Sequence, residues 1–270
     1  CVSKQEPLKA GFLKLVQSAM QKVTTIKPAK KRENVQRDDS RGAFLKRVEK
    51  EIANLDEWQK RAAIESPEGP QRIRGLAGSG KTVVLALKAA YLHAQNPDWK
   101  IAVTFYSRSL YQQFTDLIRR FSFGHINDEP NWENLRVLHS WGGGERDGMY
   151  SEMAKHAGMP VRDFVYAKNV HGMEKAFEGI CTELLASTDG AINSPVYDAV
   201  LIDEAQDLPP AFFQLVHRFT RNVQGRESKR IVWAYDELQN LTNASMPALE
   251  SLFGLDRQGR PNVQLMSDPG

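Results

Sequence analysis

The chain has 270 residues, of which 41% are hydrophobic and 26% are charged. These ordinary values exclude a disordered tail, a collagen-like repeat and a disulfide scaffold. With 36 basic against 33 acidic residues, the net charge of +3 is too small to indicate a polyanion partner by itself. No apolar run approaches the roughly 18 residues of a membrane span, and Cys1 and Cys181 are too few for a disulfide framework. We therefore expect a cytoplasmic protein with no membrane partner.

The first 42 residues differ in pattern from the rest. Apolar residues recur at three- and four-residue intervals from Leu8 to Val23, which predicts an amphipathic helix. The chain is then polar and basic from Thr24 to Gly42, as in a solvated linker, with a phosphate-binding arm as the alternative. Because position 1 is Cys and not Met, we expect the chain to be a piece of a longer protein. Residues 1–42 are thus taken as an N-terminal helix and basic linker.

From residue 43 the chain begins with two predicted helices, around 44–55 and 56–66, and then alternates between strands and helices. Short apolar runs predict a strand that begins at Ile73 and further strands at 101–105, 135–138, 200–202 and 231–234. Helices are predicted between them at 82–94, 110–121 and 212–219. Strands that alternate with helices indicate an α/β fold, a parallel sheet covered by helices on both faces.

The alternation lapses between residues 142 and 195. Three consecutive glycines at 142–144 supply a hinge, and segments around Met153, 164–166 and 173–185 have helical patterns. We expect a mostly α-helical insertion over 142–195 that projects from the edge of the sheet. The sheet domain is then expected over 43–141 and 196–250, followed by a polar linker at 251–270.

The segment G-L-A-G-S-G-K-T at 75–82 matches the phosphate-loop pattern G-x-x-x-x-G-K-(S/T), between a predicted strand and a predicted helix. Glycines let successive backbone N–H groups face a triphosphate, and the helix that follows offers its positive end. The Lys81 ammonium would reach the β- and γ-phosphates, and the Thr82 hydroxyl would ligate Mg²⁺. The predicted cofactors are ATP and Mg²⁺. The expected nucleotide contacts in this loop are Gly75, Ala77, Gly78, Ser79, Gly80, Lys81 and Thr82.

Two carboxylates, Asp203 and Glu204, follow the apolar strand at 200–202. The carboxyl ends of parallel strands meet at one edge of a sheet, so we expect these acids beside the phosphate loop. Asp203 can hold the metal, directly or through water, and Glu204 can orient and deprotonate the attacking water. The structural alternative is an acidic helix N-terminus that complements the helix dipole.

The sequence D-E-A-Q-D at 203–207, with the phosphate loop upstream, resembles the first motor domain of UvrD/Rep-like superfamily 1 helicases over roughly residues 55–241. The resemblance implies a RecA-like P-loop NTPase fold. Gln59, 16 residues before Gly75, is similar to the family's adenine-reading glutamine. The segment A-Y-D-E-L-Q-N at 234–240 is similar to the family's coupling motif, in which Gln239 would sense the γ-phosphate and Asp236 would face the nucleotide.

Two further segments resemble the family's nucleic-acid motifs. In T-F-Y-S-R at 104–108, Phe105 would stack on a base, with Tyr106 as the alternative stacking residue and a core position as the structural alternative for Phe105. In V-L-H-S-W at 137–141, His139 would meet the nucleic acid backbone unless it is merely structural, and Val137 stands where the family has threonine. The implied partner is single-stranded DNA, with RNA not excluded.

The leading hypothesis is an ATP-driven DNA helicase motor in which Glu204, Lys81 and Gln239 are catalytic and 3′→5′ movement is implied by the resemblance. Such motors bind ATP between two RecA-like domains, and arginines of the second domain stabilise the transferred phosphoryl group. Only 29 residues follow Leu241. We therefore expect a second RecA-like domain outside this chain, and weak hydrolysis by the chain alone.

The alternative hypothesis is an ATP-dependent switch that gates a nuclease or effector domain of the longer protein. A kinase-like enzyme acting on a small molecule is a third interpretation, in which Glu204, Gln206 and Gln239 have no evident role.

Overall fold

The computed structural model describes residues 68–76, 78–126, 129–142, 147–188, 195–236, 248–256 and 258–265, with only the backbone at 123–126. The predicted N-terminal helices and basic linker lie outside these residues. So do three predicted site residues, Gln59, Ala77 and Gln239.

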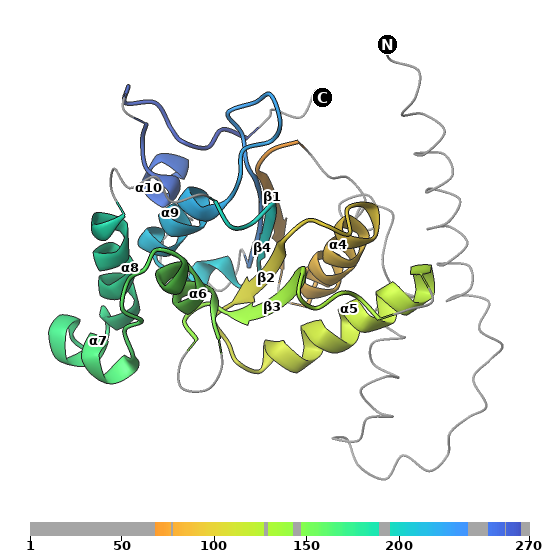
Figure 1. The fold of residues 1–270 in the computed structure, drawn as a ribbon, viewed down its shortest axis with the longest axis horizontal. Helices are drawn as coiled ribbons and strands as arrows, with labels where there is room; N and C mark the ends of the chain where they lie inside the picture. The colour runs from red at the N-terminus through yellow and green to blue at the C-terminus, as the bar shows by residue number, and fades with distance from the viewer. Residues whose placement is uncertain are drawn as a thin grey trace, which may run out of the picture.

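In the described part of the chain, five strands form one sheet in the order β1-β5-β4-β2-β3, and every neighbouring pair is parallel (Figure 1). This order places β5 between β1, which leads into the phosphate loop, and β4, which leads into the acidic segment. The five predicted strands are confirmed. Their bounds are Gln71–Gly75 for β1, Ile101–Phe105 for β2, Leu135–His139 for β3, Ala199–Ile202 for β4 and Arg230–Asp236 for β5.

One face of the sheet is covered by helices α4 (Lys81–Gln95) and α5 (Leu110–Ile126). Successive strand side chains point to opposite faces, so Ile101 and Val103 of β2 and Leu201 of β4 pack under these two helices. The intervening Ala102, Val200 and Ile202 belong to the core of the opposite face. Burial on both faces explains why these strands are apolar throughout instead of alternating.

The other face is covered by α9 (Pro210–Phe219), α10 (Leu249–Phe253) and the helices that follow β3, on the opposite side of the sheet from α4 and α5 in Figure 1. These last helices are α6 (Met149–His156), α7 (Phe164–His171) and α8 (Ala176–Ser187). The mostly helical character predicted for 142–195 is therefore confirmed. Its predicted position is wrong, because Met149, Met153, Phe177 and Ile180 are buried in one core with β4, β5 and α9 and do not project from the sheet's edge.

The predicted fold class, an α/β P-loop domain with a parallel sheet covered by helices on both faces, is thus confirmed by the layers and the strand order. Within the described residues, no helix combines the length and the apolar character that crossing a membrane requires.

Candidate active site

The phosphate loop connects β1 to α4 at the carboxyl edge of the sheet. Gly78 and Gly80 have φ of 74° and 80°, in the left-handed region that favours glycine. Between them the Ser79 N–H donates to the Leu76 carbonyl at 3.1 Å, which closes the turn. A Cβ on Gly75 would lie 2.4 Å from the Ser79 hydroxyl, so a larger residue there would force the Ser79 side chain to turn away. The loop shape therefore depends on Gly80, which the motif specifies, and on Gly78, which the motif leaves open.

Lys81, the first residue of α4, folds its side chain back over the loop. Its ammonium donates to the carbonyls of Gly75 at 3.1 Å and Leu76 at 2.9 Å. It also lies 3.9 Å from the carboxylate of Asp236 at the end of β5. Only 8% of the Lys81 side chain is exposed. A buried ammonium held by exchangeable acceptors is chemically suited to a phosphate oxygen.

Thr82 and Asp203 meet at this edge although they are 121 positions apart in the sequence. The Thr82 hydroxyl donates to Asp203 Oδ2 at 2.6 Å. Asp203 is fully buried, and its own N–H donates to the Thr104 carbonyl of β2 at 2.9 Å. Burial raises the pKa of Asp203 to about 6, and the hydrogen bond from Thr82 opposes that rise.

This pair of oxygens fits the metal that the motif predicts. Mg²⁺ takes oxygen ligands, binds through one or two protein groups, and keeps water and substrate phosphate for the rest of its octahedron. The Thr82 hydroxyl and the Asp203 carboxylate supply such ligands within contact distance of each other. The described residues contain no cluster of three or more His, Cys, Asp or Glu side chains suited to a metal.

Glu204 has an unusual backbone conformation directly after Asp203. Its φ is 49°, and among the described residues no other non-glycine has a positive φ. Its N–H donates to Asp203 Oδ1 at 3.0 Å. Such strained positions cluster at functional sites, where the surrounding structure holds them in place.

Gln206 connects Glu204 to the end of β5. Its side-chain amide N–H donates to the Glu204 carboxylate, and its amide oxygen accepts the Asp236 N–H at 3.3 Å. From the sequence, Gln206 contributes to the family resemblance but has no predicted position in the site. The signal that could have found it is its place in the acidic motif, two residues after Glu204. The structure makes it the link between the acidic segment and the strand that leads to Gln239.

Phe105, the predicted base-stacking residue, is a core residue. Its ring is fully buried and stacks on Phe114 of α5, with ring centroids 5.4 Å apart. A ring enclosed in this way cannot stack on a base. The reason is the strand's geometry, since Phe105 shares the face of β2 that carries Ile101 and Val103 under α4 and α5. Tyr106, the alternative, is 41% exposed at the same edge.

His139 uses both ring nitrogens within the protein. Its Nδ1 accepts the N–H groups of Trp141 at 3.2 Å and Gly142 at 3.3 Å. Because Nδ1 is an acceptor, Nε2 carries the proton and donates to the Tyr106 carbonyl at 2.6 Å. Burial lowers the pKa of His139, which favours this neutral form. The structure thus shows His139 joining the loops after β2 and β3. Both of its ring nitrogens are hydrogen-bonded within the protein, so neither is free to contact a nucleic acid backbone.

Neither a protein-family model nor a curated protein matches the sequence. Among solved structures, the chain is similar to the UvsW helicase from bacteriophage T4, with 12% sequence identity and a TM-score of 0.38. The alignment covers 74% of this chain and 61% of that one, so the chain spans less than two thirds of that structure's length. A structural similarity this weak carries no argument about the chemistry of the site, which is therefore argued from the residues of this chain.

Proposed function

We propose that this chain contains the ATP-binding motor domain of a UvrD-like superfamily 1 DNA helicase, which couples Mg-ATP hydrolysis to movement along a single strand. The observation that carries the proposal is the 2.6 Å contact between Thr82 of the phosphate loop and Asp203 at the end of β4. Two segments that the sequence separates by more than a hundred residues supply, at one point, the two ligand types of a phosphate-bound magnesium ion.

The residue roles follow from this geometry. The loop N–H groups and the Lys81 ammonium would hold the phosphates, and Thr82 and Asp203 would hold Mg²⁺, which neutralises charge on the β- and γ-phosphates when bound. Glu204, fixed by its backbone and by Gln206, would orient and deprotonate the attacking water. Gln59 as the base-reading residue and Gln239 as the γ-phosphate sensor belong to the same proposal, on the resemblance alone.

A second candidate is the ATP-dependent switch, and a specific observation favours it. Of the three predicted nucleic-acid contacts, Phe105 is buried, and both ring nitrogens of His139 are hydrogen-bonded to backbone groups. Tyr106 is then the remaining predicted contact that a nucleic acid could reach. A protein that senses a nucleic acid needs fewer contacts than one that moves along it. Both candidates share the nucleotide chemistry and differ in how turnover depends on strand length.

The experiment that tests the nucleotide site is calorimetric titration with a non-hydrolysable ATP analogue, with and without Mg²⁺. Lys81→Ala should weaken binding about 10- to 100-fold in both conditions, because a charge-assisted hydrogen bond is worth roughly 1.5–3 kcal/mol. Thr82→Val should lower only the Mg²⁺-dependent part of the affinity. Lys168→Ala, at an exposed lysine of α7, is the matched control. Wild-type affinity in Lys81→Ala would contradict the proposal.

A further inference from the structure

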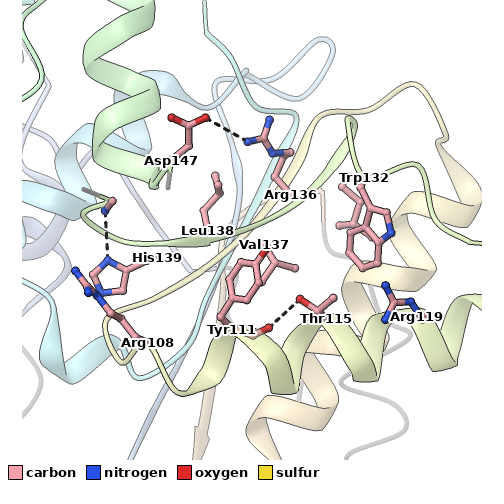
Figure 2. Close-up of a pocket in the computed structure, with 12 residues that line it drawn as sticks. Arg108, Tyr111, Thr115, Arg119, Trp132, Arg136, Val137, Leu138, His139 and Asp147 are labelled. Atoms are coloured by element: carbon pink, nitrogen blue, oxygen red, sulfur yellow. Dashed lines mark hydrogen bonds and ion pairs between the residues drawn. The ribbon is translucent and has the colours of Figure 1, made fainter. Parts of the chain in front are cut away.

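A groove of about 640 Å³ lies between α5 and β3 (Figure 2). β3 is at the opposite end of the sheet from β1, which leads into the phosphate loop. Tyr111, Thr115 and Arg119 line it from α5, where their four-residue spacing puts them on one helix face. Arg136 and Leu138 line it from β3, which is the last strand in the order and has no further strand beside it in the described residues. Trp132 stands at one end, and Arg108 and His139 stand at the other.

The groove is predominantly cationic. Arg108, Arg119 and Arg136 line it, against a single acidic lining residue, Asp147. Arg119 is oriented by Glu129 at 2.7 Å, and Arg136 by Glu152 at 2.6 Å. Within the described residues no acidic side chain forms an ion pair with Arg108, whose side chain is exposed at the start of the groove. The Arg119–Glu129 pair is exposed, and such a pair exchanges partners at little cost, so the Arg119 guanidinium remains able to meet an anion. Arg136 is held more firmly, because Glu152 is only 18% exposed and Asp147 lies 4.0 Å away on the groove side. Arg108 and Arg119 are therefore the cations that the groove can offer.

One aromatic ring, Tyr111, lies between Arg108 and Arg119 along α5, and a second, Trp132, lies beside Arg119 at the end of the groove. Tyr111 is 42% exposed on the groove side of α5. The Arg119 guanidinium lies over the Trp132 ring, 5.8 Å from its centroid. Trp132 itself is half-buried against the core under α4 and α5. A groove that combines guanidinium groups with one exposed and one half-buried ring matches the two parts of a single-stranded nucleic acid, because phosphates need positive charge and unpaired bases stack on aromatic faces.

We propose that this groove binds a segment of single-stranded nucleic acid, with Arg108 and Arg119 facing phosphates and Tyr111 and Trp132 facing bases. The proposal rests on the proposed function, for whose partner it supplies a second contact surface. The groove is continuous with the expected contact at Tyr106, because His139 both lines the groove and bonds the Tyr106 carbonyl. A strand that crosses the carboxyl edge of the sheet at Tyr106 therefore continues down the side of the domain.

The alternative occupant is an extended peptide that adds to the open edge of β3. Main-chain pairing of that kind uses the strand's backbone and takes no account of Arg108 or Tyr111. The charge and the rings therefore favour the nucleic acid, and the peptide is an outcome that the test distinguishes.

The test is fluorescence anisotropy with a labelled oligothymidylate, without nucleotide, over a series of salt concentrations. Tyr111→Ala should weaken binding about 5- to 100-fold without changing the salt dependence, because stacking on a base is worth roughly 1–3 kcal/mol. Arg108→Ala should reduce the slope of log K against log salt by about 0.7, the value for one phosphate contact on a single strand. Tyr111→Phe and Arg108→Lys, which keep the ring and the charge, should bind nearly as wild type does.

Arg226→Ala and Phe164→Ala are the matched controls, since both side chains are exposed and lie outside the groove. They should leave affinity and salt slope unchanged. Wild-type affinity in Tyr111→Ala and Arg108→Ala overturns the groove proposal and leaves the open edge of β3 to the peptide. No binding of the single strand by the wild type overturns it as well. Titration of the ATP analogue on the same samples separates the two proposals. If the ATP analogue binds but the groove variants leave oligonucleotide binding unchanged, or no oligonucleotide binds at all, the groove proposal alone is refuted. If the groove variants weaken oligonucleotide binding but the ATP analogue does not bind, the nucleotide-site proposal alone is refuted.

Discussion

Glu204 holds its carboxylate in place through a backbone conformation that most residues avoid. A non-glycine residue in the left-handed region costs about 1–3 kcal/mol and persists only where its surroundings fix it. Here the fixing contacts are the hydrogen bond from its N–H to Asp203 and the one from Gln206 to its side chain. These contacts fix Glu204 directly beside Asp203, as the proposed role of Glu204 in orienting the attacking water requires.

We predict that Glu204→Gln separates nucleotide binding from hydrolysis. The amide has the shape of the carboxylate and its oxygen can still accept the bond from Gln206, so affinity for Mg-ATP should change little. Single-turnover hydrolysis should fall about 100- to 10,000-fold, the usual contribution of a positioned general base. Glu174→Gln, at an exposed position before α8, is the control. Unchanged hydrolysis in Glu204→Gln would remove Glu204 from the mechanism.

The contact between Thr82 and Asp203 could be predicted from sequence because two independent rules agree on it. The phosphate-loop motif fixes what Thr82 does, and the geometry of a parallel sheet brings strand ends together at one edge. The sequence could not decide between a base-stacking and a core position for Phe105, because this residue ends an apolar strand and can belong either to the core or to the loop that follows. The direction of the Gln206 side chain could not be predicted from the sequence either, since it depends on the conformation of the turn after β4.

At the scale of elements, strands and helices were predictable because buried runs and amphipathic repeats leave local signals. The order in which strands pair depends on contacts between distant segments, and no local pattern records it. The helices α6 to α8 show the same limit. Their apolar residues predict helices, but only the structure shows that Phe177 and Ile180 close over β4 and α9 instead of extending away from the sheet.

The packing of α9 against α10 and β5 makes His217 a source of acid sensitivity. Burial and the nearby charge of Lys229 lower the pKa of His217 to about 3, and its ring packs against Phe253 at 6.3 Å. In the unfolded chain a histidine titrates near pH 6.5, so below that pH the unfolded state binds more protons than the folded one. Stability that is present at neutral pH is therefore lost as the pH falls.

We predict that His217 costs the protein up to about 3 kcal/mol of unfolding free energy between pH 6.5 and pH 4. Urea unfolding at a series of pH values should show this slope in the wild type and a shallower one in His217→Gln, which cannot gain the proton. The exposed His156 offers the control substitution His156→Gln, whose slope should match the wild type. Equal slopes in all three proteins would show that the folded state accommodates a charged His217.

At the scale of the whole molecule, the nucleotide site and the expected strand contacts share one edge of the sheet. Asp203 donates its N–H to the carbonyl of Thr104, two residues before Tyr106. Tyr106 is in turn bonded through its carbonyl to His139 at the head of the groove. The proposed metal ligand Asp203 is thus connected to the expected strand contacts through two hydrogen bonds and a short stretch of backbone. Binding at one site can change the affinity of the other only if these connecting residues adopt two alternative conformations.

This arrangement gives a prediction that distinguishes a motor from a switch. The measurement needs a protein in which this chain is joined to the second RecA-like domain that the resemblance implies. Its ATP turnover should be measured against oligothymidylates that range from roughly one site size, ~4–16 nucleotides, to several times that length, at constant total nucleotide concentration. A motor keeps hydrolysing as it moves, so its turnover number should rise with length until the enzyme dissociates before reaching the end. A switch is saturated once Tyr106 and the groove are filled, so its turnover number should be independent of length beyond one site size. Tyr111→Ala should raise the oligonucleotide concentration that gives half-maximal stimulation in either case, because it lowers the affinity for the oligonucleotide and leaves the proposed hydrolytic residues unchanged. A flat length dependence would therefore reject the motor and leave the switch, with the same nucleotide chemistry at Thr82 and Asp203.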